Sequence, residues 1–519
     1  MFMLRGGKIV AQISQFHLNL APVSPVACEL IKKHCRYKST CIEVDAIIRI
    51  INEHPFPEKP LTPTLSQHIK PSALDKGFAE NILGRLFASH SNGLKAAEFF
   101  RFCVSHGLSP PSPDAFEKTL HILTRMRYFD KAWELMEEIS ENQPSLLTLK
   151  SMSIILARTA KFKSYEDTME AFERLESSIF KGRKFGTEEF NVLLRSFCTQ
   201  RQMKEAKSVF VKMHTRFAPD TKTMNILLLG FKESGDITAV ELFYHEMVRR
   251  GFKPNGITYG IRIDAYCKRG CFGDGLRLLE EMELANCPPT LQTMTTLIHG
   301  AGIARNSSRA RQLFDELPSR NLQPDVGAYN ALMSSLIKAR DIDSALALMD
   351  EMEEKQIGHD SSSYHTMFSG LMKTNDTEVV IELYQGMIKR NFVPKTRTVV
   401  MLMKHFCQNR RLDMAMDLWN YLILKGYCPH SHALDLLVTG LCARGRVLEA
   451  FECSKQILER GRHMTEASFL MLKRFLLQGR QRDRLNEIES LIKKLHTVLP
   501  PPDGPSSAFK PLLADCSPA

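Results

Sequence analysis

The sequence repeats with a period of 35 residues, and proline marks the period. The marked positions are Pro219, Pro254, Pro289, Pro324, Pro394 and Pro429, and His359 occupies the one point of the series without a proline. A fixed period of this length is typical of a chain built from copies of one supersecondary unit, each of which buries its apolar face against its neighbours. The period therefore predicts a solenoid with one long concave face for binding.

Local patterns inside the period predict two helices in each unit. Apolar residues recur at intervals of three and four, as in Met224, Leu227, Leu228 and Phe231, which is the spacing of a helix and not of a strand. Small residues lie halfway along each unit, where two helices would need to approach closely. These are Ala206, Val240, Gly275, Ala310, Ala345, Val380, Ala415 and Ala450. The turn between the two helices is expected at Gly235, Gly270, Asn375 or Gly445 in several units.

A second column, just ahead of the prolines, predicts where each unit ends. It consists of Gly251, Asn286, Asn321, Gln356, Asn391, Gly426 and Gly461. Glycine and asparagine readily adopt the left-handed conformation that stops a helix, and a proline soon afterwards prevents its continuation. Each unit is thus expected to be a pair of short antiparallel helices.

These columns resemble the pentatricopeptide repeat family. The resemblance is closest in Gly256–Thr290 (GITYGIRIDAYCKRGCFGDGLRLLEEMELANCPPT) and Val326–Asp360 (VGAYNALMSSLIKARDIDSALALMDEMEEKQIGHD). Seven in-frame repeats fill Thr221–Thr465, and Thr187–Asp220 is one residue shorter. The tetratricopeptide alternative has a period of about 34 and a Trp/Gly/Tyr signature that is absent here. The resemblance implies an all-α fold, a right-handed α-solenoid of stacked helix-turn-helix repeats, and the pure-array (P-type) class without an editing or nuclease domain.

The chain divides into six segments by composition and register. Residues 1–40 have one acidic residue against six basic ones up to residue 39, which is typical of an organellar transit peptide, although an ordinary basic tail has the same composition. Mitochondrial targeting is favoured over chloroplast. A Pro-rich linker is expected at 41–75, degenerate repeats at 76–186, the regular array at 187–465, a capping repeat at 466–499 and a disordered tail at 500–519.

Composition and motifs argue against catalysis, metal binding and membrane insertion. Four of the thirteen cysteines, Cys198, Cys267, Cys407 and Cys442, share one column, which favours core packing over a metal site. No phosphate-binding loop, nucleophile elbow or paired-histidine motif occurs, so neither an enzyme nor a cofactor is expected. No apolar run reaches the length that spans a bilayer. The net charge of +11 fits a nucleic-acid partner.

The resemblance implies a single-stranded organellar RNA as partner, with one base held by each repeat. Base identity would be set by the residue four after each repeat start and by the last residue of the repeat. These are Asn191 with Asp220, Asn225 with Asn255, Thr295 with Asp325, and Asn330 with Asp360. In the family, Asn with Asp favours U, Asn with Asn favours C, and Thr with Asp favours G. Gly260 with Thr290 carries no information, so the implied tract is U-C-n-G-U, 5′ to 3′ along the chain.

Two alternatives remain open for these columns. An asparagine near the start of a helix can serve as a helix cap. Lys268, Lys338 and Lys373 share a column that would suit phosphate contacts or would simply lie in solvent.

Beyond His365 the repeats keep the period but lose recognised pairs, as in Val400 with His430 and Asp435 with Thr465. This leaves room for a second function, a protein-binding scaffold that associates with RNA-processing or mitochondrial ribosomal proteins.

Overall fold

The computed structural model describes residues 44–56, 59–71, 74–107, 110–373 and 377–498, which form helices joined by short turns and contain no β-strand. Residues 44–53 are helical. The remaining helices are α3 (Leu61–His68), α4 (Lys76–Ala88), α5 (Gly93–His106), α6 (Pro113–Arg125), α7 (Phe129–Asn142), α8 (Leu149–Phe162), α9 (Tyr165–Arg174), α10 (Thr187–Cys198), α11 (Met203–Met213), α12 (Thr221–Ser234), α13 (Ile237–Arg249), α14 (Gly256–Lys268), α15 (Phe272–Leu284), α16 (Leu291–Ile303), α17 (Ser307–Asp315), α18 (Val326–Lys338), α19 (Ile342–Glu354), α20 (Ser361–Leu371), α21 (Thr377–Lys389), α22 (Thr396–Gln408), α23 (Leu412–Leu424), α24 (Ser431–Cys442), α25 (Val447–Glu459), α26 (Glu466–Gln478) and α27 (Arg482–Val498), with short single turns η3 (Pro144–Leu146), η4 (Leu175–Ile179) and η5 (Pro318–Arg320).

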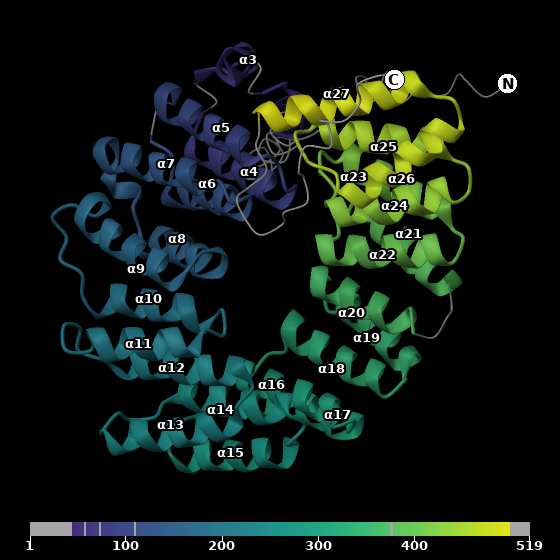
Figure 1. Ribbon diagram of the computed structural model, residues 1–519. Coiled ribbons are helices and arrows are strands. Elements are labelled where there is room, and N and C mark those ends of the chain that lie inside the picture. Colours follow the sequence, from purple (N-terminus) through teal and green to yellow (C-terminus); the bar gives the residue numbers. More distant parts are fainter. Residues whose placement is uncertain (1–43, 57–58, 72–73, 108–109, 374–376, 499–519) are drawn as a thin grey trace, which may run out of the picture.

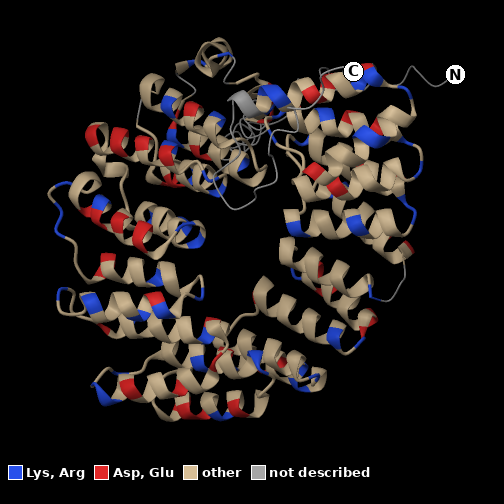
Figure 2. Cartoon of the chain, in the orientation of Figure 1, with Lys and Arg blue, Asp and Glu red and all other residues tan. Residues whose placement is uncertain are grey.

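The helices stack as antiparallel pairs in two layers, which confirms the predicted α-solenoid. The first helix of each pair, such as α12, α14, α16 or α18, faces the middle of the molecule, and the second, such as α13, α15 or α17, forms the outer layer (Figure 1). Acidic residues predominate on the outer helices α7, α9 and α15 (Figure 2). The predicted small-residue column is fully buried where the outer helices meet the inner ones.

The turn chemistry explains where the helices stop. All seven residues of the column ahead of the prolines have positive φ, from 55° at Asn391 to 84° at Gly251, as predicted. Gly235, Gly270 and Gly445 make the same left-handed turn between paired helices, and Asn375 lies outside the described residues. Arginine takes this conformation in the units without glycine: Arg201, Arg305, Arg340, Arg410 and Arg480. Sequence alone did not indicate these arginines, because arginine has no preference for positive φ.

The cysteine column packs between successive inner helices. Cys198, Cys267 and Cys442 are buried, as predicted, and Cys407 is half-buried. Gly300 lies directly against Cys267, since a Cβ on that glycine would stand 2.4 Å from the cysteine Sγ. The thiol thus fills the space that a missing side chain leaves. Burial raises the pKa of the Cys267 thiol to about 12, so it stays protonated.

The segment predicted as a Pro-rich linker is folded where the structure describes it. Residues 44–53 and α3 are helical, and Ile48, Ile51, Leu61 and Leu65 are at most 2% exposed. The apolar residues recur at helical spacing, and Pro60 precedes α3 as its N-cap, where proline does not interrupt a helix. The expected transit peptide and C-terminal tail lie outside the described residues.

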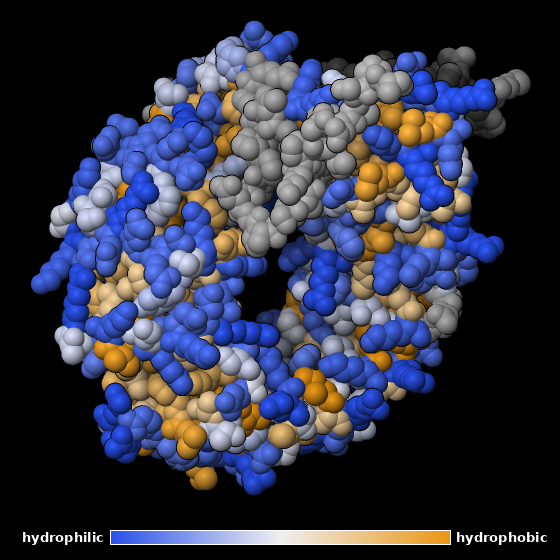
Figure 3. Space-filling model, viewed as in Figure 1, coloured by the Kyte–Doolittle hydropathy of each residue, from blue (hydrophilic) through white to orange (hydrophobic). Residues whose placement is uncertain are grey.

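The stacked pairs curve into a ring, in which the first helices meet the last repeats (Figure 1). An opening remains near the centre of the ring when all side chains are drawn (Figure 3). Among the described helices, none combines the length and the apolarity needed to cross a membrane.

Candidate nucleic-acid interface

The last residue of a repeat begins the next inner helix. Asp220, Asn255, Asp325 and Asp360 are the N-caps of α12, α14, α18 and α20, and their side chains accept hydrogen bonds from backbone N–H groups of the first turn. A side-chain oxygen at this position satisfies a donor that the helix leaves unpaired. The sequence left open whether the asparagines cap a helix; the structure shows that the residues paired with them do so instead.

Two of the predicted pairs form with the same geometry. The Asn191 amide donates to Asp220 Oδ1 over 3.4 Å, and the Asn330 amide donates to Asp360 Oδ1 over 3.1 Å. In both, the asparagine Oδ1 is shielded from solvent and has no hydrogen-bond partner. An unpaired, shielded acceptor costs about 1–3 kcal/mol, and a ligand that donates a hydrogen bond to it recovers that cost.

The carboxylate dictates this orientation. Burial acts to raise the pKa of Asp360, but hydrogen bonds from the Ser363 N–H and the Asn330 amide outweigh it and hold the pKa below its ordinary value. The pKa of Asp220 is lowered in the same way. An ionised carboxylate only accepts hydrogen bonds, so the asparagine must turn its NH₂ group toward it and its oxygen away.

The third pair differs in one hydrogen bond. The Asn225 amide donates to Asn255 Oδ1 over 3.3 Å, but Asn225 Oδ1 accepts a hydrogen bond of 2.8 Å from the hydroxyl of Thr258. The oxygen that is free in Asn191 and Asn330 is thus occupied here. The group left available on Asn225 is the second amide hydrogen, a donor.

The remaining predicted pair is not joined. Thr295 and Asp325 make no hydrogen bond with each other, and Asp325 Oδ1 accepts from the Ala328 N–H over 2.8 Å. Beyond His365, Asp435 accepts from the Thr465 hydroxyl over 2.6 Å. These later residues meet across the repeat boundary as the asparagines do.

An upstream pair was missed by the sequence interpretation. Thr148, the N-cap of α8, donates its hydroxyl to Glu117 over 2.6 Å, and Lys150 pairs with the same carboxylate. Glu117 is 6% exposed. Glu117 lies four residues after the start of α6, the position that the asparagines occupy in the later repeats. The period is broken upstream of residue 187, and the sequence interpretation therefore missed this pair.

The lysine column separates into two kinds. Lys268 lies 3.0 Å from Asp264 and 3.9 Å from Glu233, so its charge is already neutralised, and it is a poorer phosphate ligand than the sequence suggests. Lys338 and Lys373 have no acidic partner among the described residues. Burial and the neighbouring Lys373 lower the pKa of Lys338.

A basic cleft joins Lys338 and Lys373 to arginines of the turns. The cleft of about 580 Å³ is lined by Arg305, Lys338, Arg340 and Lys373 over an apolar floor that includes Ile337. The two arginines were not predicted, because their place in the cleft follows from the left-handed turns. Four cations without acidic residues in the lining favour an anionic ligand such as a phosphodiester.

Comparisons with known sequences agree with the register. The sequence model described as the PPR repeat family matches residues 219–268, 261–302 and 324–373. The one described as the PPR repeat matches 190–216, 292–322, 362–392 and 397–427. These are pentatricopeptide repeats. The PPR array thus covers the helices that carry all four predicted pairs.

Relatives from Arabidopsis thaliana carry the same repeats. The chain is 61% identical over 273 residues to pentatricopeptide repeat-containing protein At3g61360, covering 53% of this chain and 55% of the relative. It is 32% identical to the mitochondrial protein At3g22670 over 31% of this chain and 28% of the relative. It is 25% identical to small ribosomal subunit protein mL103 (rPPR7) over 37% of this chain and 46% of that protein. The alignments thus span about half of these relatives, or less.

The fold is similar to the crystal structure of the pentatricopeptide repeat protein PPR10 from maize, with 19% identity and a TM-score of 0.36 over 86% of this chain and 72% of that one. The described residues contain no group of three or more His, Cys, Asp or Glu side chains placed to hold a metal ion.

Proposed function

We propose that this PPR protein binds single-stranded RNA sequence-specifically, with one base at each of the joined pairs. The observation that carries the proposal is the free Oδ1 of Asn191 and Asn330, held in place by Asp220 and Asp360. It is an acceptor of fixed direction on the inner layer of the ring, which is the group that a base with a ring N–H needs.

The hydrogen-bond faces account for base choice. Uracil carries an N3–H donor, which matches the free oxygen of Asn191 and Asn330. Cytosine carries a lone pair at N3, which matches the remaining amide hydrogen of Asn225. With G at the repeat of Thr295 and Asp325, the target is U-C-n-G-U, 5′ to 3′ along the chain.

Binding of this kind acts by occupancy. A protein that holds several nucleotides in extended form blocks nucleases and competes with RNA hairpins, and so acts in RNA processing, stability, splicing or translation without catalysis. The relative named mitochondrial supports a mitochondrial location, with the chloroplast as the alternative. Lys338 and Lys373, with the two turn arginines, would contact phosphates.

The test is a binding titration by fluorescence anisotropy with an RNA that contains the tract and with a scrambled RNA of equal composition. We expect at least tenfold tighter binding to the tract. The logarithm of affinity should fall by about 0.7 per neutralised phosphate with the logarithm of salt concentration. Equal affinity for both RNAs would refute the proposal.

A second candidate function rests on the later repeats. Lys395 is the N-cap residue of α22 and makes no side-chain cap, and Val400 offers no hydrogen bond to a base. A relative is a small ribosomal subunit protein, so this part of the array suits a protein partner of that kind. Co-purification of ribosomal proteins without a discrete RNA footprint would favour this function.

A further inference from the structure

One hydroxyl group at each repeat boundary changes its partner with the pair beside it. Thr223, Thr258 and Ser363 are the third residues of α12, α14 and α20. Each accepts a hydrogen bond from the backbone N–H of the N-cap residue over 3.1 or 3.2 Å. A hydroxyl has a single hydrogen to donate, so it satisfies one acceptor well and not two.

The stronger acceptor takes this hydrogen. Beside Asp220 and Asp360, the hydroxyls of Thr223 and Ser363 donate to the carboxylate over 2.7 and 3.0 Å. Beside the neutral Asn255, the hydroxyl of Thr258 donates instead to Asn225 Oδ1 over 2.8 Å, with Asn255 Oδ1 more distant at 3.2 Å.

Two later repeats follow the same rule with other residues. The carboxylate of Asp435 stands at the asparagine position, and the hydroxyl of Ser468 donates to it. Where the last residue is Lys395, which accepts nothing, the Thr398 hydroxyl lies 3.1 Å from His365 Nδ1. A hydrogen bond to a charged acceptor is about twice as strong as one between neutral groups, which explains the choice.

We propose that this third-position hydroxyl sets specificity, because it decides whether the asparagine shows a base its oxygen or only its amide hydrogen. The inference rests on the proposed function. At Asn225 the Thr258 hydroxyl masks the acceptor and leaves a donor, which selects cytosine. At Asn191 and Asn330 the carboxylate draws the hydroxyl away and leaves the acceptor without a hydrogen-bond partner in the protein, which selects uracil.

Thr258→Val tests this with a side chain of similar shape. The freed Asn225 Oδ1 then accepts from uracil N3–H, and the ratio of U to C affinity at this repeat should rise about tenfold, the worth of one hydrogen bond. Thr258→Ser keeps the hydroxyl and should keep the wild-type ratio, which also controls for folding.

Thr223→Val is the matched control. It removes the same bond to the N-cap backbone but no bond to Asn191, so the preference of that repeat for uracil should change less than twofold. An unchanged ratio in Thr258→Val, with Thr258→Ser folded and binding, would overturn the inference. A wild-type protein indifferent to U or C at every repeat would instead refute the proposed function.

A second inference comes from the closure of the ring. We call the junction the seam: residues 48–56 and 89–95 against residues 423–430 and 456–462. The Cys428 N–H donates to Ser89 O over 3.0 Å. The Asn52 amide donates to Gly426 O over 3.0 Å, and these two residues are 374 positions apart in the sequence. Arg462 donates to His90 O over 2.9 Å.

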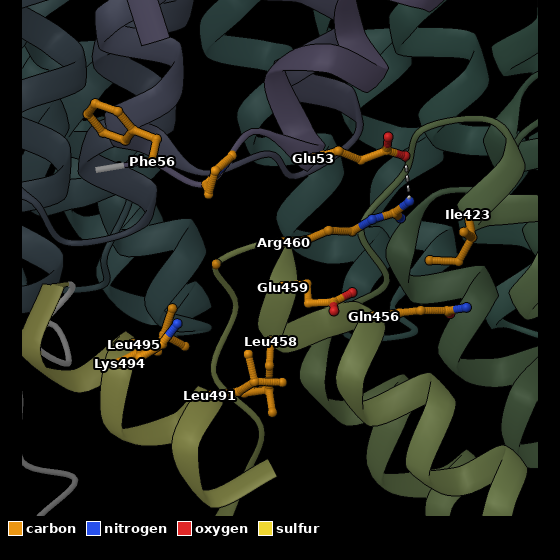
Figure 4. A pocket seen from close by; sticks show the side chains of 12 residues that line it. Glu53, Phe56, Ile423, Gln456, Leu458, Glu459, Arg460, Leu491, Lys494 and Leu495 are labelled. Atoms are coloured by element: carbon orange, nitrogen blue, oxygen red, sulfur yellow. Dashed lines mark ion pairs between the residues drawn. The ribbon is translucent and has the colours of Figure 1, made fainter. Parts of the chain in front are cut away.

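The seam is held by polar contacts and contains a cavity. Buried Lys95 donates to Asn52 O over 2.7 Å, and Arg460 lies 3.7 Å from Glu53 across a pocket of about 620 Å³ (Figure 4). Among the described residues, the two large apolar clusters of the ring, from Val44 to Leu227 and from Tyr259 to Leu495, share only Leu94 and Tyr128.

A half-buried histidine contributes to the seam. His90 Nε2 lies 2.7 Å from the Thr396 hydroxyl. Burial, and then the charges of Arg125, Arg462 and His430, lower the pKa of His90 to about 3, so the ring is neutral at pH 7.

The apolar core is interrupted once more, on the side of the ring away from the seam (Figure 1). A small cluster around Leu228 and Ala265 shares Met203 and Phe243 with the first large cluster but no residue with the second. Beside it Arg262 pairs with Glu241 over 2.7 Å and with Glu281 over 3.0 Å, and its guanidinium lies 3.8 Å from the Tyr244 ring centroid. The apolar packing is thus interrupted between this small cluster and the second arc, where the ion pairs of Arg262 lie.

We infer that the ring is a clamp that opens at the seam, bends at α12–α14 and admits an internal stretch of RNA from the side. Opening the seam exposes groups that water can solvate, whereas opening a joint within either apolar arc exposes continuous apolar surface. The inference rests on the proposed function for its ligand, but the opening itself is a property of the free protein.

Hydrogen exchange measures that opening without RNA. The Cys428 amide bonds across the seam, and its neighbour Tyr427 bonds to Leu422 O within its own repeat. We expect the Cys428 amide to exchange at least tenfold faster. Equal protection of the two amides would overturn the inference.

A disulfide across the seam tests the route of RNA. A Cβ at Gly426 would lie 3.3 Å from Ile48 Cγ2, so Ile48→Cys with Gly426→Cys brings a cysteine from each side of the seam into contact, with backbone strain at residue 426, whose φ is 76°. The reduced protein should bind a linear and a circularised RNA carrying the tract, and the oxidised protein only the linear one. Binding of the circle after oxidation, or failure of the reduced protein to bind it, would overturn lateral entry. Failure with the linear RNA as well would refute the proposed function.

Discussion

Asp360→Asn separates the two roles of the last residue in a repeat. Asp360 Oδ1 accepts from the N–H groups of Ser362 and Ser363 over 2.8 Å each and from Asn330 over 3.1 Å. Asparagine caps a helix about as well as aspartate, so the start of α20 should survive the change. The base preference at Asn330 should be lost.

The magnitude follows from the hydrogen bonds. In the wild type, uracil N3–H donates to Asn330 Oδ1 and recovers the roughly 1–3 kcal/mol that this unpaired acceptor costs in the free protein, whereas cytosine leaves it unpaired. The difference is about 2 kcal/mol, or roughly 30-fold in affinity. In Asp360→Asn the Ser363 hydroxyl is released to Asn330 Oδ1, as in the Thr258 arrangement, and the preference should vanish or turn to cytosine.

The assay is fluorescence anisotropy with two RNAs that differ only in U or C at this repeat, paired with urea unfolding. Asp341→Asn is the matched control, because Asp341 caps the outer helix α19 through the Ser344 N–H and changes the net charge equally. Both variants should unfold within about 1 kcal/mol of the wild type. A retained 30-fold preference for U in Asp360→Asn would refute the reasoning.

Three further predictions concern stability and closure. Gly300→Ala, which forces a Cβ to within 2.4 Å of Cys267 Sγ and 2.7 Å of Cys267 Cβ, should destabilise the array by about 1–3 kcal/mol in urea unfolding. Gly260→Ala, with no atom within 4 Å, should not, and Cys267→Ala should rescue the first variant only in part, because the Cβ contact remains. Arg410→Gly should raise the urea midpoint by the equivalent of about 0.5 kcal/mol, because the φ of 60° suits glycine; a lower midpoint would contradict this. The pKa of His90 is about 3 in the closed ring and 6.5 in its ordinary state. The open ring therefore gains a proton on His90 as the pH falls below 6.5. The free energy of ring closure should become less favourable by about 1.4 kcal/mol at pH 5.5. Faster exchange of the Cys428 amide at pH 5.5, after correction for intrinsic rates, would show it, and unchanged protection would exclude it.

The repeat architecture was accessible from the sequence because it depends on local chemistry. Left-handed formers such as Gly251 and Asn286 stop helices by their own backbone preferences, and the small column at Ala310 and Ala345 is buried wherever two helices cross. The linker prediction at 41–75 failed because prolines dominated the composition, while the apolar spacing of residues 44–51 determined the fold.

The interaction partners of the site residues could be predicted less well from the sequence. The column shared by Lys268 and Lys338 does not show that Glu233, from the preceding repeat, lies 3.9 Å from Lys268, although the i,i+4 pair of Lys268 with Asp264 is visible in the sequence. Arg305 and Arg340 enter the basic cleft through the geometry of their turns.

The sequence by itself determined the unit, its period and the positions that meet at each boundary, since these follow from helix spacing, turn preferences and repetition. Only the tertiary structure decided which atom each asparagine leaves free, because that depends on how a single hydroxyl hydrogen is shared between three side chains from two repeats. The tertiary structure also decided that the array closes on itself, since curvature accumulates from small rotations between neighbours and brings together residues 374 positions apart.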